Sequence, residues 1–137
     1  MNIRVRFQSR SGNTKKIAVA IADAVGVTAE TVEAEFDGAA DLLFVGGALY
    51  AGKPDKALAS FLEKLDGGAV KRIAVFSTAA SGKTLLEAVK KIVGKNDVAV
   101  ASTDFQCRGR FLMMHKGRPN AADLTAAAEF AKGIAQE

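Results

Sequence analysis

The sequence predicts an α/β fold, in which a doubly wound sheet of five parallel strands carries helices on both faces. Short apolar segments typical of strands alternate along the chain with segments that have the period of amphipathic helices. One strand segment, residues 42–45 (LLFV), is apolar at every position, as in a parallel strand covered on both faces. Loops rich in Gly, Ala, Ser or Thr follow three of the strand segments. These features predict a single domain over residues 1–137, without an internal repeat or a linker.

The first predicted strand, residues 3–7 (IRVRF), alternates apolar side chains with Arg4 and Arg6. Two arginines are unusual in an inner strand, because a buried charge must be paired. We therefore expect one face of the sheet to be incompletely covered and to offer a contact for a homodimer.

The first predicted helix spans residues 13–25, where apolar residues recur every four positions. Gly26 follows it, as is common at the C-terminus of a helix. A short strand is predicted over residues 27–32, and the apolar strand over residues 42–45 comes next.

The second half of the chain repeats this alternation. Pro54 suits the first turn of a helix, where its missing N–H is not needed, and Asn120 is a favourable N-cap. The predicted elements are a helix beginning near Pro54, a strand over 72–76, a helix over 83–93, a strand over 98–105 and a final helix opened by Asn120.

The charge pattern does not indicate a nucleic-acid partner. The net charge is +4 and the pI is near 9.3, but the basic residues are scattered, and only the segment from Arg108 to Arg118 is locally basic. With Tyr50 as the single Tyr and no Trp, the chain has few aromatic residues on which bases would stack.

The remaining composition predicts a cytoplasmic protein with no membrane partner. Cys107 is the single cysteine, so an internal disulfide is excluded and a reducing compartment is favoured. The N-terminal residues lack the apolar stretch of a signal peptide. The longest uncharged run, residues 42–52, is too short to span a bilayer.

The segment between the first strand and the first helix, SRSGNT, is rich in small hydrogen-bonding side chains. The N–H groups at a helix start lack partners within the helix and carry the positive end of its dipole. Hydroxyls add donors, and a glycine lets the backbone approach an anion. Capping of the helix by Ser11 or Asn13 would need only one such side chain. The cluster therefore favours a phosphate site, made of Ser9, Arg10, Ser11, Gly12, Asn13 and Thr14.

Three other phosphate-linked patterns fit less well. A Walker A loop needs G-x-x-x-x-G-K-[ST]; residues 47–54 lack its final hydroxyl residue, and residues 77–84 lack its first glycine. The dinucleotide fingerprint G-x-G-x-x-G is absent after the first strand. A receiver domain needs carboxylates at the ends of its first and third strands, where this chain has glutamine, serine and two glycines.

The segment SRSGNT resembles the [T/S]-x-[T/S]-G-x-T loop with which flavodoxins hold the 5′-phosphate of FMN. The resemblance extends along the chain through LLFVGG with the loop ALYAG, and through IAVFS with a second loop. The length is similar to that of the short-chain flavodoxins. This resemblance implies a flavodoxin-like fold with strand order 2-1-3-4-5 and FMN as the cofactor.

The resemblance also implies the residues that hold the cofactor. The SRSGNT residues would bind the phosphate, Tyr50 would stack on the isoalloxazine ring, and Gly52 would allow a peptide flip near the ring. No catalytic side chain and no metal ligand is implied. The residues expected to line the ring are Ala48, Leu49, Tyr50, Ala51 and Gly52 on one side and Thr78, Ala79, Ala80, Ser81 and Gly82 on the other.

Two functions follow from the resemblance. The first is an electron carrier that shuttles electrons between partner redox proteins, in which the cofactor supplies the chemistry. The second is an FMN-dependent NAD(P)H:quinone-type reductase, since Ala79 and Ala80 stand where many flavodoxins carry a second stacking aromatic. A domain that has lost its flavin is a third alternative.

The charge of the chain also departs from the family, whose members are usually acidic. Basic residues near the expected flavin loops, Lys53, Lys83, Arg108 and Arg110, stand against Asp55. Because fully reduced FMN in flavodoxins is anionic, we expect a second reduction potential less negative than in acidic flavodoxins.

Overall fold

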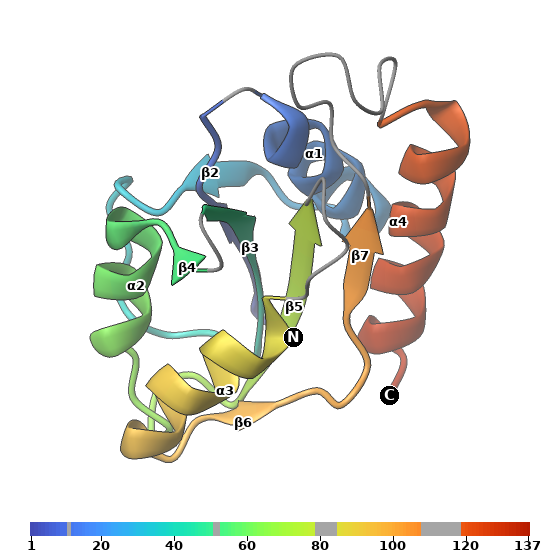
Figure 1. The fold of residues 1–137 in the computed structure, drawn as a ribbon. Helices are drawn as coiled ribbons and strands as arrows, with labels where there is room; N and C mark the ends of the chain where they lie inside the picture. The colour runs from blue at the N-terminus through green and yellow to red at the C-terminus, as the bar shows by residue number, and fades with distance from the viewer. Residues whose placement is uncertain (11, 51–52, 79–84, 108–118) are drawn as a thin grey trace.

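Five strand positions make up the central sheet of the computed structural model, which describes residues 1–10, 12–50, 53–78, 85–107 and 119–137 (Figure 1). The pairings between neighbouring positions are parallel. The predicted doubly wound sheet with strand order 2-1-3-4-5 is therefore confirmed. The positions are occupied in order by β2 (Ala29–Thr31), β1 (Ile3–Phe7), β3 (Leu42–Tyr50), β5 (Arg72–Thr78), and finally β6 (Ala99–Val100) together with β7 (Phe105–Cys107).

Helices cover both faces of this sheet (Figure 1). On one face, α1 (Asn13–Val25) and α4 (Ala121–Ala135) pack over one apolar core cluster. On the other face, α2 (Lys56–Glu63) and α3 (Leu86–Val93) pack over a second cluster. The sheet therefore separates two cores, as a doubly wound fold requires.

The apolar segment of β3 contributes to both cores. Leu42 and Phe44 belong to the cluster under α1 and α4, whereas Leu43 and Val45 belong to the cluster under α2 and α3. All four side chains are fully buried. The prediction of a strand covered on both faces is confirmed.

Some predicted boundaries differ from those of the structure. β3 continues beyond residue 45 to Tyr50 and then pairs antiparallel with β4 (Lys53–Pro54), so the expected loop is partly a hairpin. The predicted strand over 98–105 is divided into β6 and β7, which pair with the two ends of β5. Polar residues 102–104 lie between these two pieces and are not part of either strand.

The helix ends follow the local sequence. Gly26 has a φ of 76° and ends α1 in the left-handed conformation. Asn120 and Asp123 form a capping box at the start of α4, as the prediction of an N-cap at Asn120 requires. Asp55 caps α2, so Pro54 precedes that helix and belongs to β4. The helix predicted from residue 83 is described from Leu86 onward.

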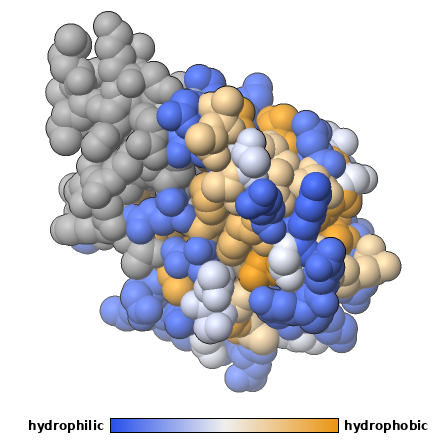
Figure 2. Space-filling view, turned by 90° about the vertical axis from the view of Figure 1, so that its right-hand side faces the viewer, coloured by the Kyte–Doolittle hydropathy of each residue, from blue (hydrophilic) through white to orange (hydrophobic). Residues whose placement is uncertain are grey.

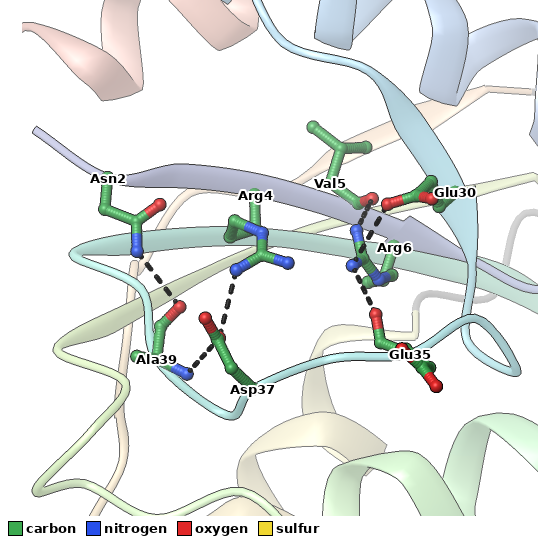
Figure 3. Close-up of polar contacts among 8 residues, drawn as sticks. All are labelled: Asn2, Arg4, Val5, Arg6, Glu30, Glu35, Asp37 and Ala39. Atoms are coloured by element: carbon green, nitrogen blue, oxygen red, sulfur yellow. Dashed lines mark hydrogen bonds and ion pairs between the residues drawn. The ribbon is translucent and has the colours of Figure 1, made fainter.

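The expectation of an incompletely covered sheet face at Arg4 and Arg6 is wrong. Only 1% of Arg6 is exposed, because the segment of residues 32–38 after β2 covers this face of the strand. Arg6 Nη2 lies 3.2 Å from Glu30 Oε2 and donates to the carbonyl oxygen of Glu35 over 3.1 Å (Figure 3). The charge of Arg6 is therefore buried and paired within the chain, and the homodimer stays a prediction.

Phe36 and Asp37 complete this cover. The guanidinium carbon of Arg4 lies 4.8 Å and that of Arg6 lies 5.2 Å from the centre of the Phe36 ring. Arg4 also pairs with Asp37 at 3.0 Å (Figure 3). The two arginines of β1 thus hold the segment of residues 32–38 against the sheet.

The opposite side of the molecule carries the alanine-rich α4. Ala121, Ala122 and Ala126 are exposed, and Figure 2 shows pale apolar surface among hydrophilic side chains on this side. Among the described residues, the large hydrophobic side chains that are exposed belong to Met1 and Val19. None of the described helices combines the length and the apolar character needed to cross a bilayer.

Candidate functional site

The predicted site segments begin at one edge of the sheet. Phe7 of β1 pairs with Gly46 of β3, and Ala48 of β3 pairs with Thr78 of β5. The carboxyl ends of these parallel strands, at the top of Figure 1, therefore lie next to one another. In doubly wound folds ligands bind beyond this edge, where the strand order reverses.

The start of α1 has the geometry of an anion site. Gly12 is the N-cap and has a φ of 89°, a left-handed conformation that glycine adopts without strain. Its N–H donates to Ser9 Oγ over 2.9 Å. Since the cap is a glycine and Asn13 is the first residue of the helix, Asn13 is not the cap. The positive end of the helix thus meets the hydroxyl of Ser9 at the carboxyl edge of β1.

A hydroxyl pair joins the start of α1 to the end of β5. Thr14 Oγ1 and Thr78 Oγ1 lie 2.7 Å apart, and only 2% of Thr14 and 3% of Thr78 are exposed. The sequence assigns Thr14 to the phosphate and Thr78 to the flavin ring. The structure brings the two residues into direct contact.

Arg10 links the same loop to the start of α2. Its Nε and Nη2 donate to Asp55 Oδ2 over 3.1 and 2.7 Å. Asp55 Oδ1 accepts from the N–H of Ala57 over 2.9 Å and so caps α2. These hydrogen bonds, that of Ala57 first and that of Arg10 second, hold the pKa of Asp55 below its ordinary value. Asp55 was absent from the predicted site, although its position directly before a helix indicated a cap.

Glycines at the end of β3 allow the layers to pack closely. A Cβ atom on Gly46 would overlap the ring of Phe76, and one on Gly47 would lie 2.7 Å from Leu58 Cδ2. Ala48 and Leu49, which follow, are partly exposed, and Leu49 packs against the core under α2. Tyr50 ends the strand and pairs with Lys53.

Seven of the predicted site residues lie outside the described part of the chain. They are Ser11, Ala51, Gly52, Ala79, Ala80, Ser81 and Gly82. The described residues bring together the phosphate segment, the end of β3 and the end of β5.

Two buried polar atoms at this edge were not predicted. Gln8 Oε1 and Ser77 Oγ have no hydrogen-bond partner among the described residues. Because side chains alternate between the two faces of a strand, both residues lie on the sheet face that α2 covers, with Gly47 between them. Only knowledge of the strand register could have placed these two side chains in one row.

The chemistry of the donors fits a phosphate group. The N–H groups at the start of α1 and the hydroxyl of Ser9 are donors that suit an anion. The carboxylate close to them, Asp55, is already paired with Arg10. Within the described ranges, no group of three His, Cys, Asp or Glu residues is placed to hold a metal ion.

A pocket of about 520 Å³ lies elsewhere, between α2 and the segment of residues 32–38. Phe36, Phe61 and Lys64 are among its lining residues, and none of the predicted site residues is. The pocket therefore does not coincide with the predicted site.

Comparison with known proteins identifies the family. The family model for a flavodoxin domain matches residues 4–115. The fold is similar to oxidised flavodoxin 2 from Bacillus cereus (TM-score 0.75, 21% identity, 99% of each chain). It is also similar to a flavodoxin from the Archaea (TM-score 0.74, 19% identity, 99% of this chain and 97% of that one). The flavodiiron core of Flv1 from Synechocystis contains a similar fold (TM-score 0.76, 16% identity, 99% of this chain and 35% of that one).

No curated protein sequence matched the chain. The family model covers most of the sequence, and its match begins in β1 and extends beyond β7. The chain therefore belongs to the flavodoxin family, a family of FMN-binding electron-transfer proteins.

Proposed function

We propose that this chain binds FMN at the carboxyl edge of its sheet and carries electrons between partner redox proteins in the cytoplasm. The observation that carries the proposal is the start of α1, where the left-handed Gly12 and the hydroxyl of Ser9 lie at the positive end of the helix, next to the ends of β3 and β5. Bound FMN would supply the electron-transfer chemistry. The protein binds and orients the cofactor, and none of its side chains needs to act as an acid or a base.

The proposed contacts divide between the phosphate and the ring. The phosphate is held by the segment of residues 9–14, through N–H groups of α1 and the side chains around Gly12. Residues 48–52 and residues 78–82 would hold the ring, and Tyr50 would supply an aromatic contact to it. Membership of the family supports FMN binding as such, and this assignment of residues is our own.

The phosphate assignment is tested by substituting Gly12. Gly12 and Gly38 have φ angles of 89° and 83°, and neither has atoms within 4 Å of an added Cβ. Gly12→Val and Gly38→Val therefore impose similar backbone strain at two different places. We expect Gly12→Val to weaken FMN binding roughly tenfold or more, which corresponds to about 1.4 kcal/mol, whereas Gly38→Val lowers stability alone.

The measurement is a titration of the flavin-free chain with FMN, followed by absorbance and fluorescence. Equal FMN affinities in the two variants would contradict the assignment of the phosphate site to the start of α1. A parent chain that shows no flavin spectrum and binds no FMN would contradict the proposed function itself.

The reductase remains the second candidate, because Ala79 and Ala80 stand in the place of an aromatic residue that would cover the ring. An uncovered ring would admit a substrate. Steady-state oxidation of NAD(P)H by the purified holoprotein, with a quinone as acceptor, separates the two functions, since a carrier alone shows no turnover.

A further inference from the structure

The contact between Thr14 and Thr78 joins two parts of the site that are far apart in the sequence. Their hydroxyl oxygens lie 2.7 Å apart, although the residues are separated by 64 positions. Thr14 lies in the first turn of α1, and Thr78 is the last residue of β5. Both are almost fully buried, so water does not compete for this hydrogen bond.

The number of protons limits what this pair can do. Each threonine hydroxyl has one proton to donate and two lone pairs that accept. If Thr78 donates to Thr14, the proton of Thr14 stays available for a third group. An acceptor placed beside Thr14 therefore favours this direction, and a phosphate oxygen is such an acceptor.

We propose that Thr78 is a positioning residue for the phosphate, which it reaches through Thr14 without touching the phosphate itself. Thr78 donates to Thr14 Oγ1, and this bond orients the hydroxyl of Thr14 toward the phosphate oxygen. Hydrogen bonds in such a chain strengthen one another. The inference rests on the proposed function, and it adds a role of the Thr78 hydroxyl at the phosphate to the proposed place of this residue beside the ring.

The neighbouring residue shows that burial at the end of β5 does not by itself require a hydroxyl partner. Ser77 is fully buried, and its Oγ has no hydrogen-bond partner among the described residues. It precedes Thr78 and therefore faces the other side of the sheet. Ser77→Ala is thus a matched control, because it removes a buried hydroxyl from the same strand end without changing the Thr14 contact.

The test compares FMN with riboflavin, which has the same ring and no phosphate. Thr78→Val keeps the shape of the side chain and removes the hydroxyl, whereas Thr78→Ser keeps the hydroxyl. We expect Thr78→Val to lower FMN affinity roughly five- to tenfold, within the range of one hydrogen bond between neutral groups, with riboflavin affinity unchanged. Thr78→Ser and Ser77→Ala should keep the parent ratio of the two affinities.

Inorganic phosphate provides a second probe, because it occupies only the Thr14 end of the site. It should raise the melting temperature of the flavin-free parent and of Thr78→Ser more than that of Thr78→Val. If Thr78→Val does not fold, Thr78→Ala carries the same comparison.

The outcomes separate the two proposals. The role of Thr78 would be overturned if Thr78→Val lost FMN and riboflavin affinity equally, or lost neither, and still responded to phosphate like the parent. FMN binding itself would then remain in place. A parent chain that binds neither FMN nor phosphate would overturn both.

Discussion

At the scale of single residues, Arg6 shows how this sheet holds a charge that its strand buries. The guanidinium has a carboxylate from β2, the carbonyl oxygen of Glu35 and the ring of Phe36 around it. Burial lowers the pKa of Arg6, and Glu30 opposes this effect. Removing the partner of a buried charge lowers stability more than removing the partner of an exposed charge. The partners of Arg6 should therefore contribute more to stability than those of Arg4.

We therefore predict that Glu30→Gln destabilises the chain by about 1–2 kcal/mol, less than for a fully buried pair because Glu30 is half-exposed. Asp37→Asn removes the partner of Arg4, but that carboxylate is largely exposed, and the loss should be smaller. Urea unfolding of the parent and both variants checks the order. A larger loss in Asp37→Asn would contradict the importance of pairing Arg6.

At the scale of elements, α2 is tied to the phosphate segment through its cap. Asp55 accepts from Ala57 at the start of the helix and from Arg10 across the site. The same carboxylate therefore stabilises a helix and holds one of the residues assigned to the phosphate.

The sign of the pH dependence follows from the pKa of Asp55, which lies below its ordinary value of 3.8. The ionised form is favoured in the folded chain, so its contribution to stability is present above the ordinary pKa and is lost as the pH falls through the lower, folded value. Asn at position 55 keeps a capping oxygen and loses the charge.

We predict that Asp55→Asn is less stable than the parent at neutral pH and that the difference shrinks as the pH falls below about 4. The free energy of unfolding in urea, measured from neutral pH down to pH 2, checks this. A difference that stays constant over the whole range would show that the charge of Asp55 does not contribute.

The elements also show what could be predicted from the sequence. The pattern of apolar residues predicted the central strands, because β1 alternates and residues 42–45 of β3 are all apolar. The continuation of β3 to Tyr50 was missed, since its glycines are typical of a loop, whereas here they fit against Phe76 and Leu58. The cover over Arg6 and the Thr14–Thr78 contact were missed because both depend on residues far apart in the chain.

At the scale of the whole molecule, the chain carries an excess of positive charge. The net charge is +4. At the carboxyl edge the charge of Asp55 is already balanced by Arg10, so the exposed Lys53 is not neutralised by that carboxylate. Lys53 pairs through its backbone with Tyr50, directly beside the proposed ring site.

We predict that Lys53→Glu has a more negative second reduction potential than the parent when both are loaded with FMN, because a negative charge near the ring disfavours added electrons. Lys95→Glu makes the same change of charge in the short helix that precedes β6, at the other edge of the sheet. Salt screens charges beyond a Debye length of about 8 Å, so Lys95→Glu should have little effect. Spectroelectrochemistry of the three proteins at low and physiological salt measures this potential. Equal shifts of the potential in the two variants would contradict a local effect of Lys53.

The division of the last sheet position into β6 and β7 has a consequence for behaviour at high concentration. An edge strand with a long row of unpaired N–H and C=O groups can recruit a strand from another molecule and begin aggregation. Here β2 has three residues, β6 has two and β7 has three. Within the part of the chain that the structure describes, neither margin of the sheet presents a long template for intermolecular pairing, which disfavours aggregation by strand addition.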